Sequence, residues 1–374
     1  MFHLDQPSGL FLASMARPDC AGSGILHPDS LAADGSWKAP VGTGPFSLTE
    51  WKPGQYVVLS RFHDYSLRDD AAPDGFTGKK QALVDEVRFM VIPDPSSAKA
   101  ALMSNNIDLL PNVSASDAQE LKTTPGVQIS FSPIMAICGL LFQTNDPLLK
   151  DVRIRQAIAH SLDYGQMVNA LSNGTSEPNN SAIAQTSPFY SATAKQGYRY
   201  DPQLAQRLLK EAGYHGQPIK MIVNKRYSQM FDMGLLSQAM AVASGLNIQM
   251  ETLEWGTQLE RYQSGNYQMM AFSYSSRLDP ATSFDSLMGD KSKEPRKVWD
   301  NPQAQAVLRE AVRESDTAKR QALFDQLHSM MIHDTPMVII YNGTVAAALR
   351  DSVKGFHSWP VSSPRLWGVS LAAH

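Results

Sequence analysis

The alternation of apolar and polar residues predicts a hairpin in the early part of the chain. Phe46 and Leu48 alternate with polar neighbours, which is the two-residue period of a half-buried strand. Residues 56–59 (YVVL) have the composition of a second strand. The segment 52–55 (KPGQ) between them is typical of a tight turn, because proline fixes one corner and glycine allows a positive φ at the next.

A G-T-G sequence at residues 42–44 precedes this hairpin and raises the question of a phosphate-binding loop. Such a loop must open a helix, so that free backbone N–H groups point at the anion. Here the glycines are followed by Pro45, which has no N–H, and then by strand-like residues. We therefore expect a structural turn and no bound nucleotide.

Strands and helices alternate over the second half of the chain, which predicts an α/β domain. Strands are expected at Ile219–Val223, Ile248–Leu253 and Tyr267–Tyr274, separated by helices at about 230–244 and 256–264. The other expected elements are strands at 86–92, 127–131, 134–143 and 337–341, and helices at 96–104, after Asn301-Pro302 and after Asp316.

Two further segments have the apolar spacing of amphipathic helices. Residues 151–171 place four apolar side chains close to one helical face: Ile154, Ile158, Leu162 and Val168. Residues 200–214 form a helix that Asp201 caps and Gly213 ends. The residues expected on its inward face are Leu204, Leu208 and Ala212.

Length and composition indicate a globular protein of two domains. A chain of 374 residues is too long to fold around one ordinary hydrophobic core. Its content of 43% hydrophobic and 18% charged residues excludes a disordered chain. The net charge of −3 is not the positive charge expected of a protein that binds nucleic acid or an acidic membrane. The longest apolar run, residues 134–142, is too short to cross a bilayer, and the first residues lack the basic region of a signal peptide.

The motifs of common enzymes and metal sites are absent from the sequence. It contains no G-x-S-x-G, no H-E-x-x-H and no C-x-x-C. His328 and His333 are five residues apart and do not share a helical face, so we expect solvated or capping roles. Cys20 and Cys138 allow one disulfide, although two buried thiols are favoured. We therefore expect no catalytic residue, metal or cofactor.

One stretch is rich in aromatic residues beside a few charges. It contains Trp255, Tyr262, Tyr267, Phe272, Tyr274, Arg277 and Asp279. Aromatic walls with one or two charges are how a small-molecule site holds its ligand. The alternative is that these residues belong to the core of their strands, which we favour for Phe272. For the segment 273–284 (SYSSRLDPATSF), which follows a strand, both interpretations remain open.

Five ordered segments resemble one family. They are PVGTGPFSLTEWKPGQYVVLSRFHDY, DVRIRQAIAHSLD, YDPQLAQRLLKEAGY, LEWGTQLERYQSGNYQMM and DSVKGFHSW…LWGVSL. The chain resembles the solute-binding proteins of peptide ABC importers, from about Pro40 to Leu371. This family includes dipeptide-, oligopeptide- and nickel-binding proteins.

The resemblance implies an α/β fold of the two-lobed periplasmic-binding-protein type, whose lobes close on a ligand. The first lobe would comprise residues 1–143, the second 144–337, and residues 338–374 would return to the first. The crossings would fall near 141–145 and 337–342. Family members are longer at the N-terminus and carry a secretion signal, so the first lobe is expected to be incomplete here. An N-terminally extended form should therefore be more stable.

The resemblance also implies a set of ligand-binding residues. Asp279, which precedes a proline, would hold the α-amino group of a peptide. Arg226 and Tyr227 partly match an Arg-Pro-Tyr carboxylate anchor but lack its proline. The expected set is Asp279, Arg277, Tyr274, Trp255, Arg226, Tyr227 and Cys138.

These observations predict a binding protein and not an enzyme. We expect a periplasmic monomer that captures a small peptide and delivers it to the permease and ATPase subunits of an ABC importer. It should contact no nucleic acid. The alternatives are the same fold binding a nickel chelate, a sugar or an opine, a hydrolase built on a cleft, or a non-functional fragment.

Overall fold

The computed structural model describes residues 2–15, 24–68, 72, 75–361 and 363–372. The chain forms two compact units. The larger unit comprises Met1–Ser14 and Pro133–Thr344, and the smaller unit comprises Met15–Ser132 and Val345–His374. The expected division into two lobes of mixed helix and sheet is confirmed.

The units divide at other positions than the sequence predicted. The predicted boundary at 143/144 follows the strand β6 (Ile137–Phe142), and that at 337/338 lies inside the strand β10 (Met337–Tyr341). These two strands pair with each other and are buried along their whole length. Both therefore belong to the core of the larger unit. The chain crosses between the units at 132/133 and 344/345 instead, and also at 14/15, because Met1–Ser14 belongs to the larger unit.

The larger unit is built on a five-stranded sheet with the order β10-β6-β9-β7-β8. The other strands are β7 (Ile219–Val223), β8 (Ile248–Thr252) and β9 (Met269–Tyr274). Strands β7, β8 and β9 are parallel, β6 is antiparallel to β9, and β10 is antiparallel to β6. The carboxyl ends of β7, β8, β9 and β10 therefore lie along one edge, which we call the carboxyl edge.

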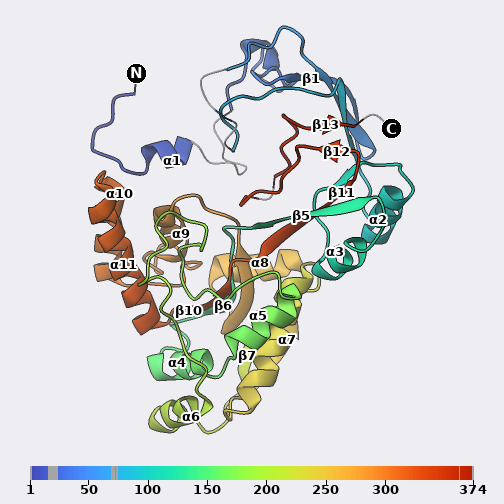
Figure 1. Cartoon of the computed structure of the whole chain (residues 1–374). Coiled ribbons are helices and arrows are strands. Elements are labelled where there is room, and N and C mark those ends of the chain that lie inside the picture. The colour runs from blue at the N-terminus through green and yellow to red at the C-terminus, as the bar shows by residue number, and fades with distance from the viewer. Residues whose placement is uncertain (1, 16–23, 69–71, 73–74, 362, 373–374) are drawn as a thin grey trace. The chain divides into compact units, whose positions relative to one another are not determined.

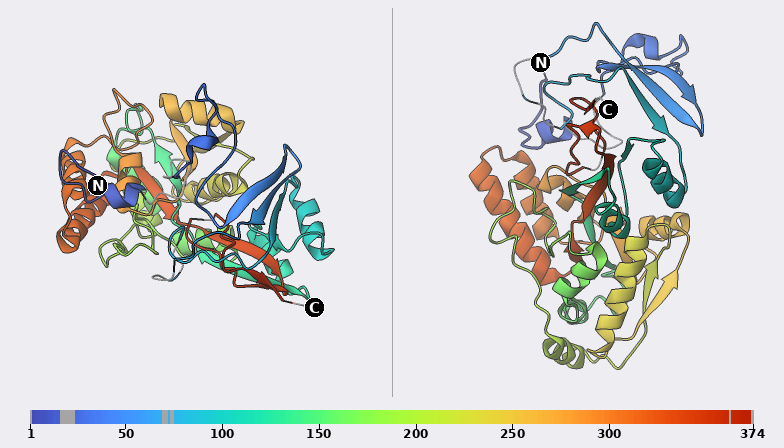
Figure 2. Two further views of the ribbon diagram at one scale, coloured as in Figure 1. Left: turned by 90° about the horizontal axis from the view of Figure 1, so that it is seen from above. Right: turned by 45° about the vertical axis from the view of Figure 1, so that its right-hand side comes forward.

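Helices cover both faces of this sheet. One face packs against α4 (Val152–His160), α5 (Tyr164–Ser172), α6 (Pro202–Glu211) and α7 (Ser228–Val242). The other packs against α8 (Trp255–Ser264), α9 (Pro280–Leu287), α10 (Pro302–Arg313) and α11 (Thr317–Asp334). Figure 1 shows α5 and α7 on one side and α10 and α11 on the other, and the turned views in Figure 2 keep this separation.

Local signals account for most of these elements, and two helical segments differ from expectation. The segment 151–171 forms two helices, because Asp163 accepts a hydrogen bond from Gln166 N (3.0 Å) and starts α5. In α6 the residues with the deepest burial are Ala205 and Leu209, one position beyond the expected face. The expected cap at Asp201 is confirmed, since its carboxylate accepts from Leu204 N at 2.8 Å.

The smaller unit contains short sheets and few helices. The hairpin expected from the sequence forms β1 (Phe46–Lys52) and β2 (Tyr56–Arg61), and β3 (Glu86–Met90) extends this sheet. Gly54 in the turn has φ +74°. Its remaining helices are the 3-10 helix η1 (Pro28–Ser30), α2 (Pro95–Met103) and α3 (Ala115–Leu121), and its remaining strands are β4 (Leu109–Leu110), β5 (Val127–Pro133), β11 (Thr344–Arg350), β12 (Val353–Lys354) and β13 (Ser370–Leu371). The short helix α1 (Phe11–Met15) lies largely in the larger unit. Helices α2 and α3 pack Leu102 and Leu121 against β11.

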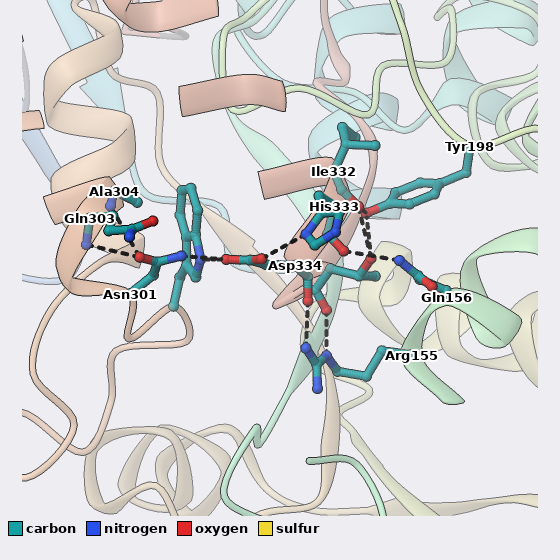
Figure 3. Close-up of polar contacts among 11 residues, drawn as sticks. Arg155, Gln156, Tyr198, Asn301, Gln303, Ala304, Ile332, His333 and Asp334 are labelled. Carbon is teal, nitrogen blue, oxygen red and sulfur yellow. Dashed lines mark hydrogen bonds and ion pairs between the residues drawn. The ribbon is translucent and has the colours of Figure 1, made fainter. Parts of the chain in front are cut away.

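A polar network closes the C-terminal end of α11 (Figure 3). The buried guanidinium of Arg155 donates to Asp334 O (2.5 Å) and Thr335 O (2.8 Å), which are carbonyls that the helix leaves unpaired. The Asp334 carboxylate accepts from Asn301 Nδ2 at 2.7 Å and from Trp299 Nε1 at 2.9 Å. Burial raises the pKa of Asp334, but these hydrogen bonds outweigh it and hold the pKa below its usual value.

We predict that Gly139→Ala destabilises the larger unit. A Cβ at this position of β6 would overlap Val338 O and lie 3.0 Å from Ile339 Cα, both on the paired backbone of β10. Because backbone cannot move aside, the free energy of unfolding should fall by roughly 1–3 kcal/mol or more in urea titrations. Gly256→Ala in α8 is the control, since its Cβ would meet nothing within 4 Å. An equal loss in both variants would contradict this reason.

Candidate functional site

The loops that follow three parallel strands converge on the carboxyl edge of the larger unit. Residues 224–227 follow β7, residues 253–254 follow β8 and residues 275–279 follow β9. Ligands of open α/β sheets bind at the carboxyl ends of the strands, where the direction of the chain connections changes. In this sheet the change falls between β9 and β7, because the connection after β7 leads to β8 on one side and the connection after β9 leads to β10 on the other.

Two buried amide side chains fix these loops to one another. Asn224 Nδ2 donates to Gln258 Oε1 at 2.8 Å, and Gln258 Nε2 donates to Ala271 O at 2.9 Å. Asn224 Oδ1 in turn accepts from Tyr227 N at 2.9 Å. The position of Tyr227 is therefore set by a chain of hydrogen bonds that reaches the middle of β9.

The aromatic residues of this edge form one continuous group, which we call the aromatic row: Tyr227, Trp255, Phe272, Tyr262 and Tyr274. The ring of Tyr227 meets that of Trp255 edge-on, with centroids 5.0 Å apart. Trp255 stacks on Phe272 at 5.8 Å, and Phe272 stacks on Tyr262 at 4.5 Å. Tyr274 contacts Phe272 edge-on at 5.1 Å. Four of these residues come from the aromatic stretch noted in the sequence, and Tyr227 comes from the loop after β7.

The aromatic row runs from the core to the surface. Phe272, Tyr262 and Tyr274 are buried, so the expectation that Phe272 is a core residue is confirmed. Burial raises the pKa of Tyr274 well above its usual value, which keeps its hydroxyl protonated. Tyr227 and Trp255 are half-buried. Arg226 is exposed, with its guanidinium 5.8 Å from the centre of the Tyr227 ring, so the outer end combines aromatic surface with a positive charge.

Asp279 makes its contacts inside the larger unit. Its carboxylate accepts two hydrogen bonds from the Arg320 guanidinium, at 2.7 and 2.8 Å, and both side chains are less than 10% exposed. Asp279 Oδ1 also accepts from Ala281 N at 2.8 Å and so caps α9. The segment after β9 is therefore a helix start. The described contacts give Asp279 a structural role, and a contact with a ligand amine stays a prediction.

The other two predicted residues contact serines of β9 and of the loop that follows it. Arg277 is half-buried and donates to Ser275 Oγ at 2.7 Å. Cys138 on β6 is a buried thiol 3.2 Å from Ser273 Oγ, and burial raises its pKa to about 11. The buried state expected for Cys138 is confirmed. Cys20 lies outside the described residues.

The carboxyl edge holds a polar cluster of Asn342 and Asn179, which the sequence analysis did not select. Asn342, directly after β10, donates to Ala136 O at 2.7 Å and accepts from Asn179 Nδ2 at 2.8 Å. Asn179 Nδ2 also lies 2.9 Å from Ile183 O. A lone asparagine after an apolar run is the only local signal. The cluster anchors the loop around residue 180 to the strands next to the chain crossings.

The expectation for the two histidines is half correct. His333 is exposed, as expected. His328 is buried, and its Nε2 donates to Gln196 O at 2.8 Å. Burial lowers the pKa of His328, because the charged ring would lose its hydration. The prediction of a solvated or capping role was therefore wrong for His328.

The described part of the chain contains neither a metal-binding cluster nor a membrane-spanning helix. No three His, Cys, Asp or Glu side chains there lie close enough together to hold a metal ion. None of its helices has both the length and the apolar character needed to cross a membrane.

The sequence belongs to the bacterial extracellular solute-binding proteins, family 5, because the model of the middle region of that family matches residues 1–295. Proteins of this class bind solutes. The dipeptide-binding protein of Escherichia coli K12 is 25% identical, in an alignment that covers 99% of this chain and 69% of the relative.

Two solved structures have the same fold. The chain matches NikA from Brucella suis in complex with Fe(III)-EDTA with a TM-score of 0.84 and 21% identity, over 99% of this chain and 76% of that one. It matches DppA from Helicobacter pylori in complex with the peptide STSA with a TM-score of 0.80 and 23% identity, over 100% and 72%. These matches confirm the predicted two-lobed fold.

We predict that Asp279→Asn lowers stability even without any solute. The amide can still cap α9, but the buried Arg320 loses its counter-charge, and breaking a buried pair costs about 3–5 kcal/mol. The sequence alone does not identify Arg320 as the partner of Asp279. Urea unfolding should show the loss.

Asp316→Asn is the matched control for this variant. Asp316 caps α11 by accepting from Lys319 N at 2.9 Å, but it is exposed. The control should lose less than about 1 kcal/mol. If Asp279→Asn were as stable as this control, the ion pair would have no structural importance.

Proposed function

We propose that this protein is the solute-binding component of an ABC importer and that it captures a peptide-like solute at the carboxyl edge of its larger unit. The observation that carries the proposal is the aromatic row, which rises from the core and ends in half-buried Tyr227 and Trp255 beside the exposed Arg226. Membership of the solute-binding family supports the same conclusion. The capture would take place in the periplasm, and the loaded protein would dock on permease and ATPase subunits.

The chemistry of this edge fits a solute with an apolar part and a carboxylate. The faces of Tyr227 and Trp255 offer apolar contact, and their positions are set by packing against Phe272 and by the Asn224 hydrogen bond. Arg226 can donate two parallel hydrogen bonds to a carboxylate. Tyr274, Arg277 and Asp279 would support this surface from behind. Such a surface holds a solute and requires no bond to be broken.

Other solutes remain candidates within the same proposal. Relatives by sequence and by fold include a dipeptide-binding protein and a structure with Fe(III)-EDTA. Both ligands carry carboxylates, so the proposed role of Arg226 is common to both. A sugar is less well matched, because it lacks a charge for Arg226. An opine carries a carboxylate, so the proposed role of Arg226 extends to it. A hydrolase would need a reacting group at this edge, and the proposal includes none.

Identification of a bound solute tests the function directly. The protein is purified from its own host and sprayed natively, and any added mass is fragmented to identify it. Calorimetry with a di- and tripeptide mixture, a nickel or iron chelate and an opine then ranks the classes. Saturable binding without turnover supports the proposal. Steady release of cleaved peptide would overturn it.

We predict that Tyr227→Ala weakens solute binding about tenfold, because a lost aromatic contact is worth roughly 1–2 kcal/mol. The free energy of unfolding should change much less, since Tyr227 is half-buried. Tyr200→Ala removes an exposed tyrosine from another part of the same unit and serves as the control. Equal affinities of the two variants would remove the aromatic row from the site.

We predict that Arg226→Gln weakens binding of peptides with a free C-terminus and leaves amidated peptides unaffected. The loss should be about fivefold at low salt and smaller at high salt, because an exposed ion pair is worth up to ~1 kcal/mol and is screened. Arg207→Gln, at an exposed position of α6, is the matched control. A similar loss for free and amidated peptides would place the carboxylate elsewhere.

A further inference from the structure

The larger unit has a cavity at the edge of its sheet opposite the carboxyl edge. It has a volume of about 300 Å³ and is lined by Gln143, Asn145, Asp146, Ser264 and Lys291, among others. Gln143 follows the end of β6, which pairs there with the start of β9. The aromatic row has its half-buried end at the opposite end of β9. This cavity is therefore separate from the proposed solute site and does not depend on the proposed function.

A buried ammonium group faces this cavity without an anionic partner. Lys291 is 6% exposed, and its Nζ donates to Gln143 Oε1 and Thr144 Oγ1, both at 2.7 Å. Both acceptors are neutral, and an ammonium has a third hydrogen to donate. No carboxylate of the described residues lies within 4.0 Å of this nitrogen, although other lysines of the chain have such partners.

The wall around Lys291 is held in place before any ligand arrives. Gln143 Nε2 donates to Gly265 O at 2.7 Å, which points its Oε1 at the ammonium. Gly265 has φ +69°, and a side chain there would press on Pro295 and on Gln143 itself. The exposed Asn145 adds an amide side chain to the rim. A rigid polar wall of this kind loses little entropy when it binds.

The charged groups around this cavity leave it short of negative charge. Burial and, to a smaller extent, the nearby Arg155 lower the pKa of Lys291 to about 8, although Asp300 opposes both effects. Asp146 also lines the cavity, but its Oδ1 already accepts from Leu148 N, Leu149 N and Gln268 Nε2. Two cations therefore lie close together, and the one carboxylate of the wall is engaged by backbone and amide donors.

We propose that this cavity binds a small carboxylate, whose oxygen accepts the third hydrogen of the Lys291 ammonium. The volume lies at the lower end of the range for ligand pockets, which suits a molecule of a few heavy atoms. A bound carboxylate would supply the counter-charge that the buried Lys291 ammonium lacks within the chain. The Asn145 amide can donate to its second oxygen. Binding requires Lys291 to be protonated.

The test uses the full chain with ¹⁵N-labelled lysine and sodium acetate as the probe. The Nζ resonance of Lys291 should shift saturably as acetate is added, and its pKa should rise. The apparent dissociation constant should increase about tenfold between pH 7 and pH 9, because the free ammonium with a pKa of about 8 is lost over that range. Phosphate and chloride at equal ionic strength should give weaker responses.

Two lysine variants separate this site from general salt effects. Lys291→Met should abolish the saturable response, and Lys293→Met should keep it, because Lys293 is 81% exposed. If Lys291→Met does not fold, the wild-type pH dependence alone decides. A linear response to acetate, a response independent of pH, an equal response in Lys291→Met, or tighter binding of phosphate would each overturn the proposal.

Discussion

The ion pair between Asp279 and Arg320 determines the arrangement of the carboxyl edge. It joins the end of β9 and the start of α9 to the first turn of α11. A buried pair repays its loss of hydration only if the remaining hydrogen bonds are satisfied. Here Asp279 also caps α9, and Arg320 Nε donates to Ala311 O at 2.9 Å. The guanidinium also lies 5.0 Å from the centre of the Phe324 ring, which packs its flat face.

This ion pair and the Arg155 network hold α11 at both ends. Arg320 lies in the first turn of the helix, and Arg155 donates hydrogen bonds to the carbonyls at its C-terminal end. The α11 layer packs against the face of the sheet that carries Phe272 and Tyr274. The inner part of the aromatic row therefore rests on elements that cannot shift independently. Side chains that are fixed in this way lose little conformational entropy if a solute binds to them.

Features encoded by neighbouring residues were predictable from the sequence, and features that depend on distant partners were not. Strands β7 and β10 and the caps at Asp201, Asn301 and Asp316 follow from local patterns, and the structure has them where expected. Four members of the aromatic row lie within residues 255–274 and were visible as one stretch. The contact between Tyr227 and Trp255 was not, because no local pattern joins these residues. Arg320 is 41 residues from Asp279, and no local pattern joins them. The same holds for the contact between His328 and Gln196 and for the buried environment of Lys291.

Two of the three chain crossings, at 132/133 and 344/345, leave the larger unit from the edge that carries the aromatic row. They run side by side there, since Ile134 N donates to Gly343 O at 3.1 Å. Gly343 has φ +91°, a conformation that other residues rarely adopt. The Asn342 amide fastens this point to Ala136 O, so the larger unit is rigid up to the last residues before the crossings. A change of conformation between the two units would then be concentrated in a few residues on either side of 132/133 and 344/345. On the proposed function, a solute held by Tyr227 and Trp255 lies at the same sheet edge as these residues, and its binding energy is available to bias their conformation.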